Sequence, residues 1–180
     1  MKTLRKVKIE GFKSIESAEL RLGDLNVVIG ANGSGKSNLI GVFRLLERVL
    51  THNLQLYVAS EPDRFLFHGR KTTPALSLDF AFDQNSYGFK LKAAQDTLIF
   101  EYERVEYSGY WNYGEPIAVG HKESKLEEAA QSYHNKIPKF VFPKVRNVVV
   151  YHFHDTSDTS PAKQTADVDD NRFLRPNAAN

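Results

Sequence analysis

The chain has 180 residues, of which 41% are hydrophobic and 26% are charged, and its formal net charge is +2. This composition is typical of one globular domain, and the near balance of charge argues against a nucleic-acid surface without excluding a local basic patch. The absence of cysteine excludes disulfides and thiolate metal sites. It also fits a cytoplasmic protein. No apolar run approaches the about 20 residues of a membrane span, and no signal-peptide pattern is present, so we expect no membrane contact.

Three strands are predicted in the first 30 residues. Residues 5–10 alternate between apolar and charged side chains, and residues 15–22 form a second strand after a turn at 11–14. The run at 25–29 is mostly apolar, so we expect a third and more buried strand there.

A phosphate-binding motif follows directly. Residues 30–37 read Gly-Ala-Asn-Gly-Ser-Gly-Lys-Ser, which matches every fixed position of G-x-x-x-x-G-K-[ST]. The glycines let the backbone approach a ligand, and successive N–H groups at a helix start surround an anion. Lys36 adds a charge for the terminal phosphates, and the Ser37 hydroxyl suits Mg²⁺. The motif predicts binding of a nucleoside triphosphate rather than a glycine-rich turn that only joins two elements.

A helix is predicted from Ser37 to about Val58. Apolar residues recur there at helical spacing, and the helix is expected to end before Glu61-Pro62.

An antiparallel meander is predicted at 74–120. Three segments alternate between apolar and polar side chains, as strands with one solvated face do, namely 76–82, 87–91 and 97–107. The aromatic residues Tyr110, Trp111 and Tyr113 are expected to cap the core of a hairpin, although such rings can also stack on a base.

The last third of the chain has three predicted parts. A short charged helix is expected at 123–134, and Pro138 and Pro143 are expected to interrupt the segment after it. The continuous apolar run at 145–153 predicts a strand that is covered on both faces.

Polar residues follow that strand. His152 and His154 share one strand face beside Asp155, which allows them to bind one metal ion. Two histidines and one carboxylate are few ligands for a transition metal, so a structural or phosphate-proximal role is favoured.

The block from Val7 to Leu46 resembles the N-terminal part of ABC-type ATPases of the SMC and RecF group. The resemblance is carried by Ile9-Glu10-Gly11-Phe12-Lys13-Ser14-Ile15 and by the run from Asn26 to Ile40, which contains the phosphate loop. Residues 151–157 and 170–176 are similar to bacterial predicted ATPases related to OLD-type and phage-defence proteins of the AAA family.

The resemblance implies an α/β fold of the P-loop NTPase class, similar to part of an ABC or SMC head. It implies one N-terminal ATPase lobe over residues 1–180. Within it we expect central strands, the phosphate loop and its Walker A helix in 1–60, an antiparallel β-subdomain in 74–120, and a short helix, a buried strand and a Q-loop-like polar tail in 121–180.

The resemblance also implies a set of site residues. ATP is expected to contact Lys13, Gly30, Ala31, Asn32, Gly33, Ser34, Gly35, Lys36, Ser37 and Asn38, with Ser37 as the Mg²⁺ ligand. For Lys13 the alternative is a solvated turn lysine. In the family a polar residue just after the last strand contacts Mg²⁺ and the attacking water. No glutamine stands there in this sequence, and His154 is the catalytic candidate.

Two family elements are absent from the sequence. No apolar segment runs directly into Asp-Glu, and no Leu-Ser-Gly-Gly-like signature is present, whereas in the family both lie further toward the C-terminus. We therefore expect the N-terminal piece of a longer ATPase, and negligible ATP hydrolysis by this chain alone. Motifs of a GTPase are also missing.

In such enzymes two heads enclose two nucleotides, so the expected partners are ATP and a second head in a homodimer. DNA or an effector protein is a further expected partner, in repair or phage defence. One alternative is a non-catalytic module that holds a nucleotide or phosphate and binds a protein. Another is a nucleic-acid binder that is independent of ATP.

Overall fold

The structure is a computed structural model that describes residues 4–59, 61–110, 112–132 and 136–151. It divides into two compact units, Met1–Val148 and Val149–Asn180. The first unit contains every helix and strand that the structure describes. Of the second unit only residues 149–151 are described, and they have no regular secondary structure.

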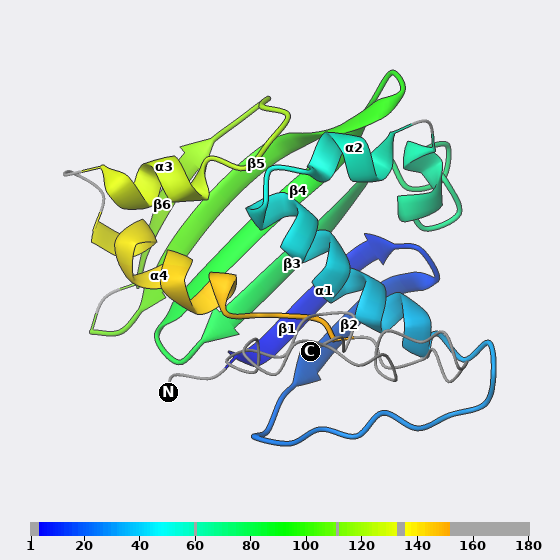
Figure 1. Cartoon of the computed structure of the whole chain (residues 1–180), viewed down its shortest axis with the longest axis horizontal. Helices are drawn as coiled ribbons and strands as arrows, with labels where there is room; N and C mark the ends of the chain where they lie inside the picture. Colours follow the sequence, from blue (N-terminus) through cyan, green and yellow to red (C-terminus); the bar gives the residue numbers. More distant parts are fainter. Residues whose placement is uncertain (1–3, 60, 111, 133–135, 152–180) are drawn as a thin grey trace, which may run out of the picture. The chain divides into compact units, whose positions relative to one another are not determined.

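One antiparallel sheet of six strands organises the first unit, in the order β2-β1-β3-β4-β5-β6 (Figure 1). The strands are β1 Leu4–Phe12, β2 Ile15–Arg21, β3 Ala75–Phe82, β4 Asn85–Ala94, β5 Thr97–Ser108 and β6 Asn112–Ala118. The strands predicted at 5–10, 15–22, 76–82, 87–91 and 97–107 are thus confirmed. Because Val7 of β1 pairs with both Leu20 and Phe80, the N-terminal hairpin and the meander form a single sheet.

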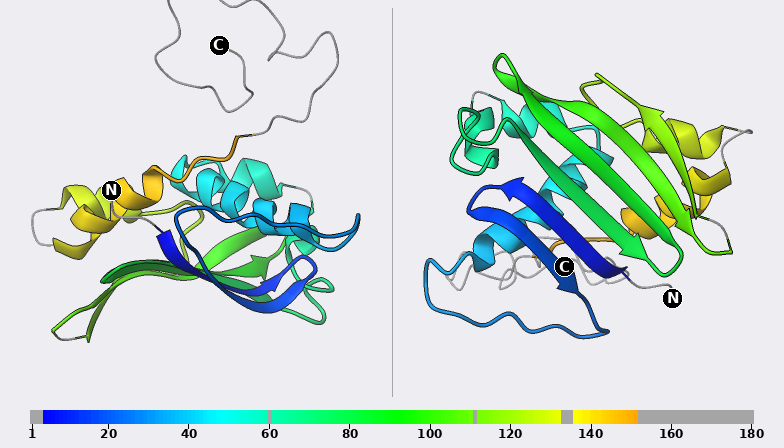
Figure 2. Two further views of the ribbon diagram at one scale, coloured as in Figure 1. Left: turned by 90° about the horizontal axis from the view of Figure 1, so that it is seen from below. Right: turned by 180° about the vertical axis from the view of Figure 1, so that it is seen from behind.

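One face of this sheet forms the core and is covered by helices (Figure 2). The helices are α1 Lys36–Leu50, α2 Leu54–Val58, α3 Leu126–Gln131 and α4 Lys136–Arg146, with a 3-10 turn at Pro62–Phe65. α1 turns Val42, Leu45, Leu46 and Val49 into the core, where all four are fully buried. This combination confirms the predicted α/β class. No helix in the described ranges is both long and apolar enough to cross a membrane.

The predicted helix from Ser37 to Val58 is wrong at one point, because it is two helices. The chain turns at 51–53, where His52 adopts a left-handed conformation with φ of 53°. Asn53 N–H then donates to the Arg48 carbonyl, which ends α1 before α2 begins. The predicted end before Glu61-Pro62 is confirmed, since α2 ends at Val58.

The C-terminal elements also differ from the prediction. Pro138 and Pro143 do not prevent helix formation, because both lie within α4. Pro138 is in the first turn, where a backbone N–H has no helical partner to lose. The strand predicted at 145–153 is wrong in its described part, because α4 continues to Arg146 and residues 148–151 have no regular structure.

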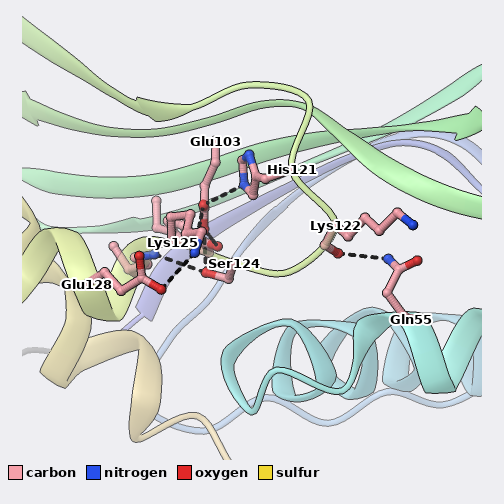
Figure 3. A network of polar contacts seen from close by, with 9 residues as sticks. Gln55, Glu103, His121, Lys122, Ser124, Lys125 and Glu128 are labelled. Atoms are coloured by element: carbon pink, nitrogen blue, oxygen red, sulfur yellow. Dashed lines mark hydrogen bonds and ion pairs between the residues drawn. The ribbon is translucent and has the colours of Figure 1, made fainter.

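A buried carboxylate joins the sheet to the connector before α3. Glu103 of β5 is fully buried. Its Oε1 accepts hydrogen bonds from Tyr87 Oη at 2.6 Å and from Ser124 Oγ at 2.5 Å. Its Oε2 accepts a hydrogen bond from the Lys125 N–H at 2.8 Å and lies 3.0 Å from His121 Nε2. Figure 3 shows Glu103 with Ser124, Lys125 and His121 around it. Both oxygens are therefore satisfied, as a buried charge requires.

The same connector is tied to α2. The Glu123 carboxylate accepts hydrogen bonds from the backbone N–H groups of Leu54 and Gln55, at 3.1 and 2.9 Å. The Gln55 amide donates to the Lys122 carbonyl at 2.7 Å (Figure 3). The connector thus links β5 to the helical pair that begins at the phosphate loop.

We predict that Glu103→Gln lowers the free energy of unfolding by about 2 kcal/mol, because an amide keeps one acceptor oxygen and leaves a donor at the other position, such as the Lys125 N–H, without an acceptor. Chemical denaturation at neutral pH measures the change. Asp96→Asn, on an exposed turn, removes the same charge and serves as the control. Equal stability of Glu103→Gln and the parent chain would contradict the role assigned to the carboxylate.

The stability that Glu103 contributes should also depend on pH. Burial would raise the pKa of Glu103, but the hydrogen bonds from His121 and Ser124, among others, outweigh burial and hold the pKa below its ordinary value. The contribution is therefore complete above the pKa of the unfolded chain and is lost as the pH falls through the lower pKa of the folded state. Denaturation of the parent and of Glu103→Gln should converge on acidification.

Candidate nucleotide site

The phosphate loop leads directly into α1, as its motif requires. Gly33 and Gly35 have φ of 82° and 91°, in the left-handed region that favours glycine. Gly35 precedes the first helical residue, and its carbonyl accepts from the N–H groups of Asn38 and Leu39, both at 3.0 Å. Gly30 has no positive φ, but a Cβ there would lie 2.7 Å from Ser34 Oγ. The backbone conformation thus favours glycine at positions 33 and 35, whereas a Cβ at position 30 would require the Ser34 side chain to move.

The Lys36 ammonium is held by its own loop. Nζ donates to the carbonyls of Gly30 and Ala31, both at 2.6 Å, and lies 3.4 Å from Ser34 Oγ. The charge is therefore placed over the loop that is expected to receive phosphate. A phosphate bound there would replace carbonyl oxygens as the acceptor of this ammonium, and a charge-assisted bond of that kind is the stronger one.

The strand predicted at 25–29 is not formed. The exposed fractions are 85% for Leu25, 76% for Val27 and 87% for Ile29, and no strand among the described residues pairs with this run. A strand needs a neighbour to satisfy its backbone groups. Asn26 instead closes a local turn, donating to the Gly23 carbonyl at 3.0 Å and accepting from the Gly23 N–H at 2.9 Å.

The β1–β2 turn contacts the start of α1. Asn38 Nδ2 donates to Ser14 Oγ at 2.6 Å, which links the turn to the first turn of the helix. The resemblance implied that Asn38 contacts the nucleotide, whereas in the structure its side chain binds Ser14. Because the two residues are 24 positions apart, no local pattern reveals this pair.

The Lys13 side chain lies beside Gly41 of α1, beyond the phosphate loop. Its Nζ is 5.5 Å from the ring centre of Phe12 and 5.4 Å from that of Phe65, and it would lie 3.6 Å from a Cβ at Gly41. Burial, and then the charges of Arg64 and Arg44, lower the pKa of Lys13. The charges that act on Lys13 are thus positive, which suits a group that faces an anion.

Ser37 is exposed in the first turn of α1, so its hydroxyl is accessible to Mg²⁺. One protein oxygen fits a magnesium ion that retains waters and phosphate oxygens as its other ligands. No group of three or more metal-ligating acids or histidines occurs among the described residues. His152, His154 and Asp155 lie outside the described residues.

A cleft of about 470 Å³ adjoins the loop. Its walls are the β1–β2 hairpin, residues 28–30 and the start of α1, and they include Ile15, Ala18, Val28, Gly35 and Lys36. The walls also include the polar side chains of Ser14, Glu16 and Ser17, and a mixed lining of this kind suits a ligand with both apolar and polar parts. Asn32 and Gly33 are exposed at the tip of the loop.

The sequence did not predict the buried cluster of titratable residues Glu103, Tyr87 and His121. It is not a second candidate site, because both carboxylate oxygens are already bonded within the protein.

Comparison with known proteins identifies the family of this chain. The chain is similar to the solved structure of an SMC ATPase, described for ATP-driven dimerization and DNA-stimulated activation, with 22% identity, a TM-score of 0.39, and coverage of 64% of this chain and 72% of that chain. No curated protein shows a significant match. A model of the AAA ATPase domain family matches residues 1–171. Since that match spans nearly the whole chain, the protein belongs to the AAA ATPase domain family.

Proposed function

We propose that this chain binds ATP with Mg²⁺ as the N-terminal lobe of an ABC/SMC-type ATPase. The observation that carries the proposal is the phosphate loop at 30–37, which ends at the N-terminus of α1 with the Lys36 ammonium placed over it. A helix start and a full positive charge at one place form an anion site of high specificity. Membership of an ATPase family supports ATP as the ligand.

Each residue of the site has a proposed role. The backbone N–H groups of Gly30, Ala31, Asn32, Gly33, Ser34 and Gly35 surround the phosphates. Lys36 neutralises their charge, and Ser37 binds Mg²⁺, which when bound shields the developing charge of phosphoryl transfer. Asn38 holds the β1–β2 turn against α1 through Ser14. Lys13 offers a second cation, one helical turn beyond Ser37.

Hydrolysis is proposed to depend on a partner. The sequence lacks an apolar run into Asp-Glu, so this chain alone should turn ATP over negligibly. A second head that contributes a signature motif is the proposed partner, with DNA or an effector protein in repair or phage defence. His154 is the proposed polar residue beside Mg²⁺.

A second candidate function rests on the exposed run at 25–29. If no strand ever pairs with residues 25–29, the phosphate loop stays unsupported on that side. The chain is then a non-catalytic module in which nucleotide or phosphate is a structural ligand. The two functions differ in turnover once a partner head is supplied.

We predict that Lys36→Ala weakens ATP binding by at least about tenfold, because charge-assisted bonds to phosphate are lost. Calorimetric titration with ATP and Mg²⁺ measures the affinity of both chains. Lys71→Ala removes the same charge at an exposed position outside the loop and should bind as the parent does. Unchanged affinity of Lys36→Ala would refute the assignment of the loop.

We predict that Ser37→Ala removes the dependence of ATP affinity on Mg²⁺. The parent chain should bind ATP more tightly with Mg²⁺ than with a chelator, whereas Ser37→Ala should bind equally in both conditions. Ser37→Thr retains the hydroxyl and should keep the dependence. A Mg²⁺ effect of the same size in Ser37→Ala would show that the ion is held elsewhere.

A further inference from the structure

α4 carries an uneven distribution of charge. Its 11 residues include four cations and no acid. Pro138, Val141 and Val145 are buried, and α4 packs against α3, β4 and β5 (Figure 1). The opposite face is exposed and carries Lys136, Lys139, Phe140, Pro143 and Arg146. The amphipathic helix therefore presents a cationic face to solvent.

Among the described residues, the acids of the adjacent α3 do not neutralise this face. The acidic residues of α3 have other partners, since Glu127 lies 3.8 Å from His52 and Glu128 lies 2.8 Å from Lys125. Within the described part of the chain, none of the ion pairs includes a cation from the exposed face of α4. A cationic face that has no ion-pair partner among the described residues is expected to attract a polyanion.

An aromatic ring lies within the same face. Phe140 is 64% exposed, and the exposed cations Lys136 and Lys139 precede it at i−4 and i−1. A single exposed ring is not unusual by itself, and its significance here is that it lies among cations. A ring flanked by cations matches the chemistry of single-stranded nucleic acid, whose bases stack on aromatic rings while its phosphates bind lysine and arginine.

We propose that the exposed face of α4 binds single-stranded nucleic acid, with phosphates on Lys136, Lys139 and Arg146 and a base stacked on Phe140. A duplex would use the cations but offers no unstacked base for the ring. A membrane is disfavoured, because the apolar face of α4 is buried against the sheet and cannot insert. The inference does not rest on the proposed ATP site, since none of these residues belongs to the phosphate loop.

The test is fluorescence anisotropy of a labelled oligothymidylate of about 16 nucleotides, titrated with the full chain without ATP. Lys136→Gln with Lys139→Gln should weaken binding and reduce the salt slope of log Kd by about 0.7 for each phosphate that is no longer neutralised. Lys71→Gln with Lys92→Gln makes the same change in net charge at exposed positions elsewhere and should bind as the parent does.

The ring is tested separately. Phe140→Leu should weaken binding by about tenfold and leave the salt slope unchanged, whereas Phe140→Tyr keeps an aromatic ring and should restore the affinity. Circular dichroism and thermal melting of each variant check that the fold is retained, as expected for exposed positions.

Three outcomes overturn the proposal. The first is no binding by the parent chain at low salt. The second is equal weakening by the α4 pair and by the control pair, which would show a response to net charge alone. The third is tighter binding to a duplex, to polyaspartate or to anionic vesicles than to the single strand, with no effect of Phe140→Leu. ATP binding is measured in parallel, so a failure here is distinguishable from a failure of the nucleotide site.

Discussion

The packing of α1 against the buried face of the sheet is the constraint on which the site depends. The phosphate loop and α1 are continuous, so whatever fixes the helix also fixes one end of the loop. Val42, Leu45, Leu46 and Val49 are fully buried there, and each apolar side chain of this size contributes about 1.5–3 kcal/mol when it leaves water. The helix N-terminus, and with it the N–H groups that we propose to bind phosphate, is therefore held by the core rather than by the loop itself.

Sequence patterns predicted the parts of the fold that are specified locally. The phosphate loop follows from the fixed residues of its motif, and five strands follow from alternation. The predictions failed where contacts between residues distant in the sequence determine the local structure. The run at 25–29 has the composition of a strand but no neighbour to pair with among the described strands. The left-handed conformation of His52 has no signature in the helical pattern, and Pro138 is tolerated because it falls in the first turn of α4.

The buried carboxylate shows a different reason for failure. Leu98 and Phe100 point into the core, and so do Glu103 and Val105, so the inward positions of β5 shift by one residue between 100 and 103. Strict alternation does not accommodate this shift, which accompanies the irregular pairing of β5 with β4 and β6. Alternation alone places Glu103 on the solvated face. Its true position depends on Tyr87, His121 and Ser124, which reach it from separate parts of the sequence.

The exposed run at 25–29 bears on how tightly the loop can hold a nucleotide. Apolar residues on both sides of an extended segment are expected where a strand is covered on both faces. In the described structure this run lies in water, so the side of the loop opposite α1 has no sheet to support it. A segment that paired with the run would order the loop, and a loop ordered by ATP would in turn favour that pairing. By linkage the two affinities would rise by the same factor. The phosphate loop would then couple nucleotide binding to assembly, with Lys36 releasing the carbonyls of Gly30 and Ala31 as the phosphates enter.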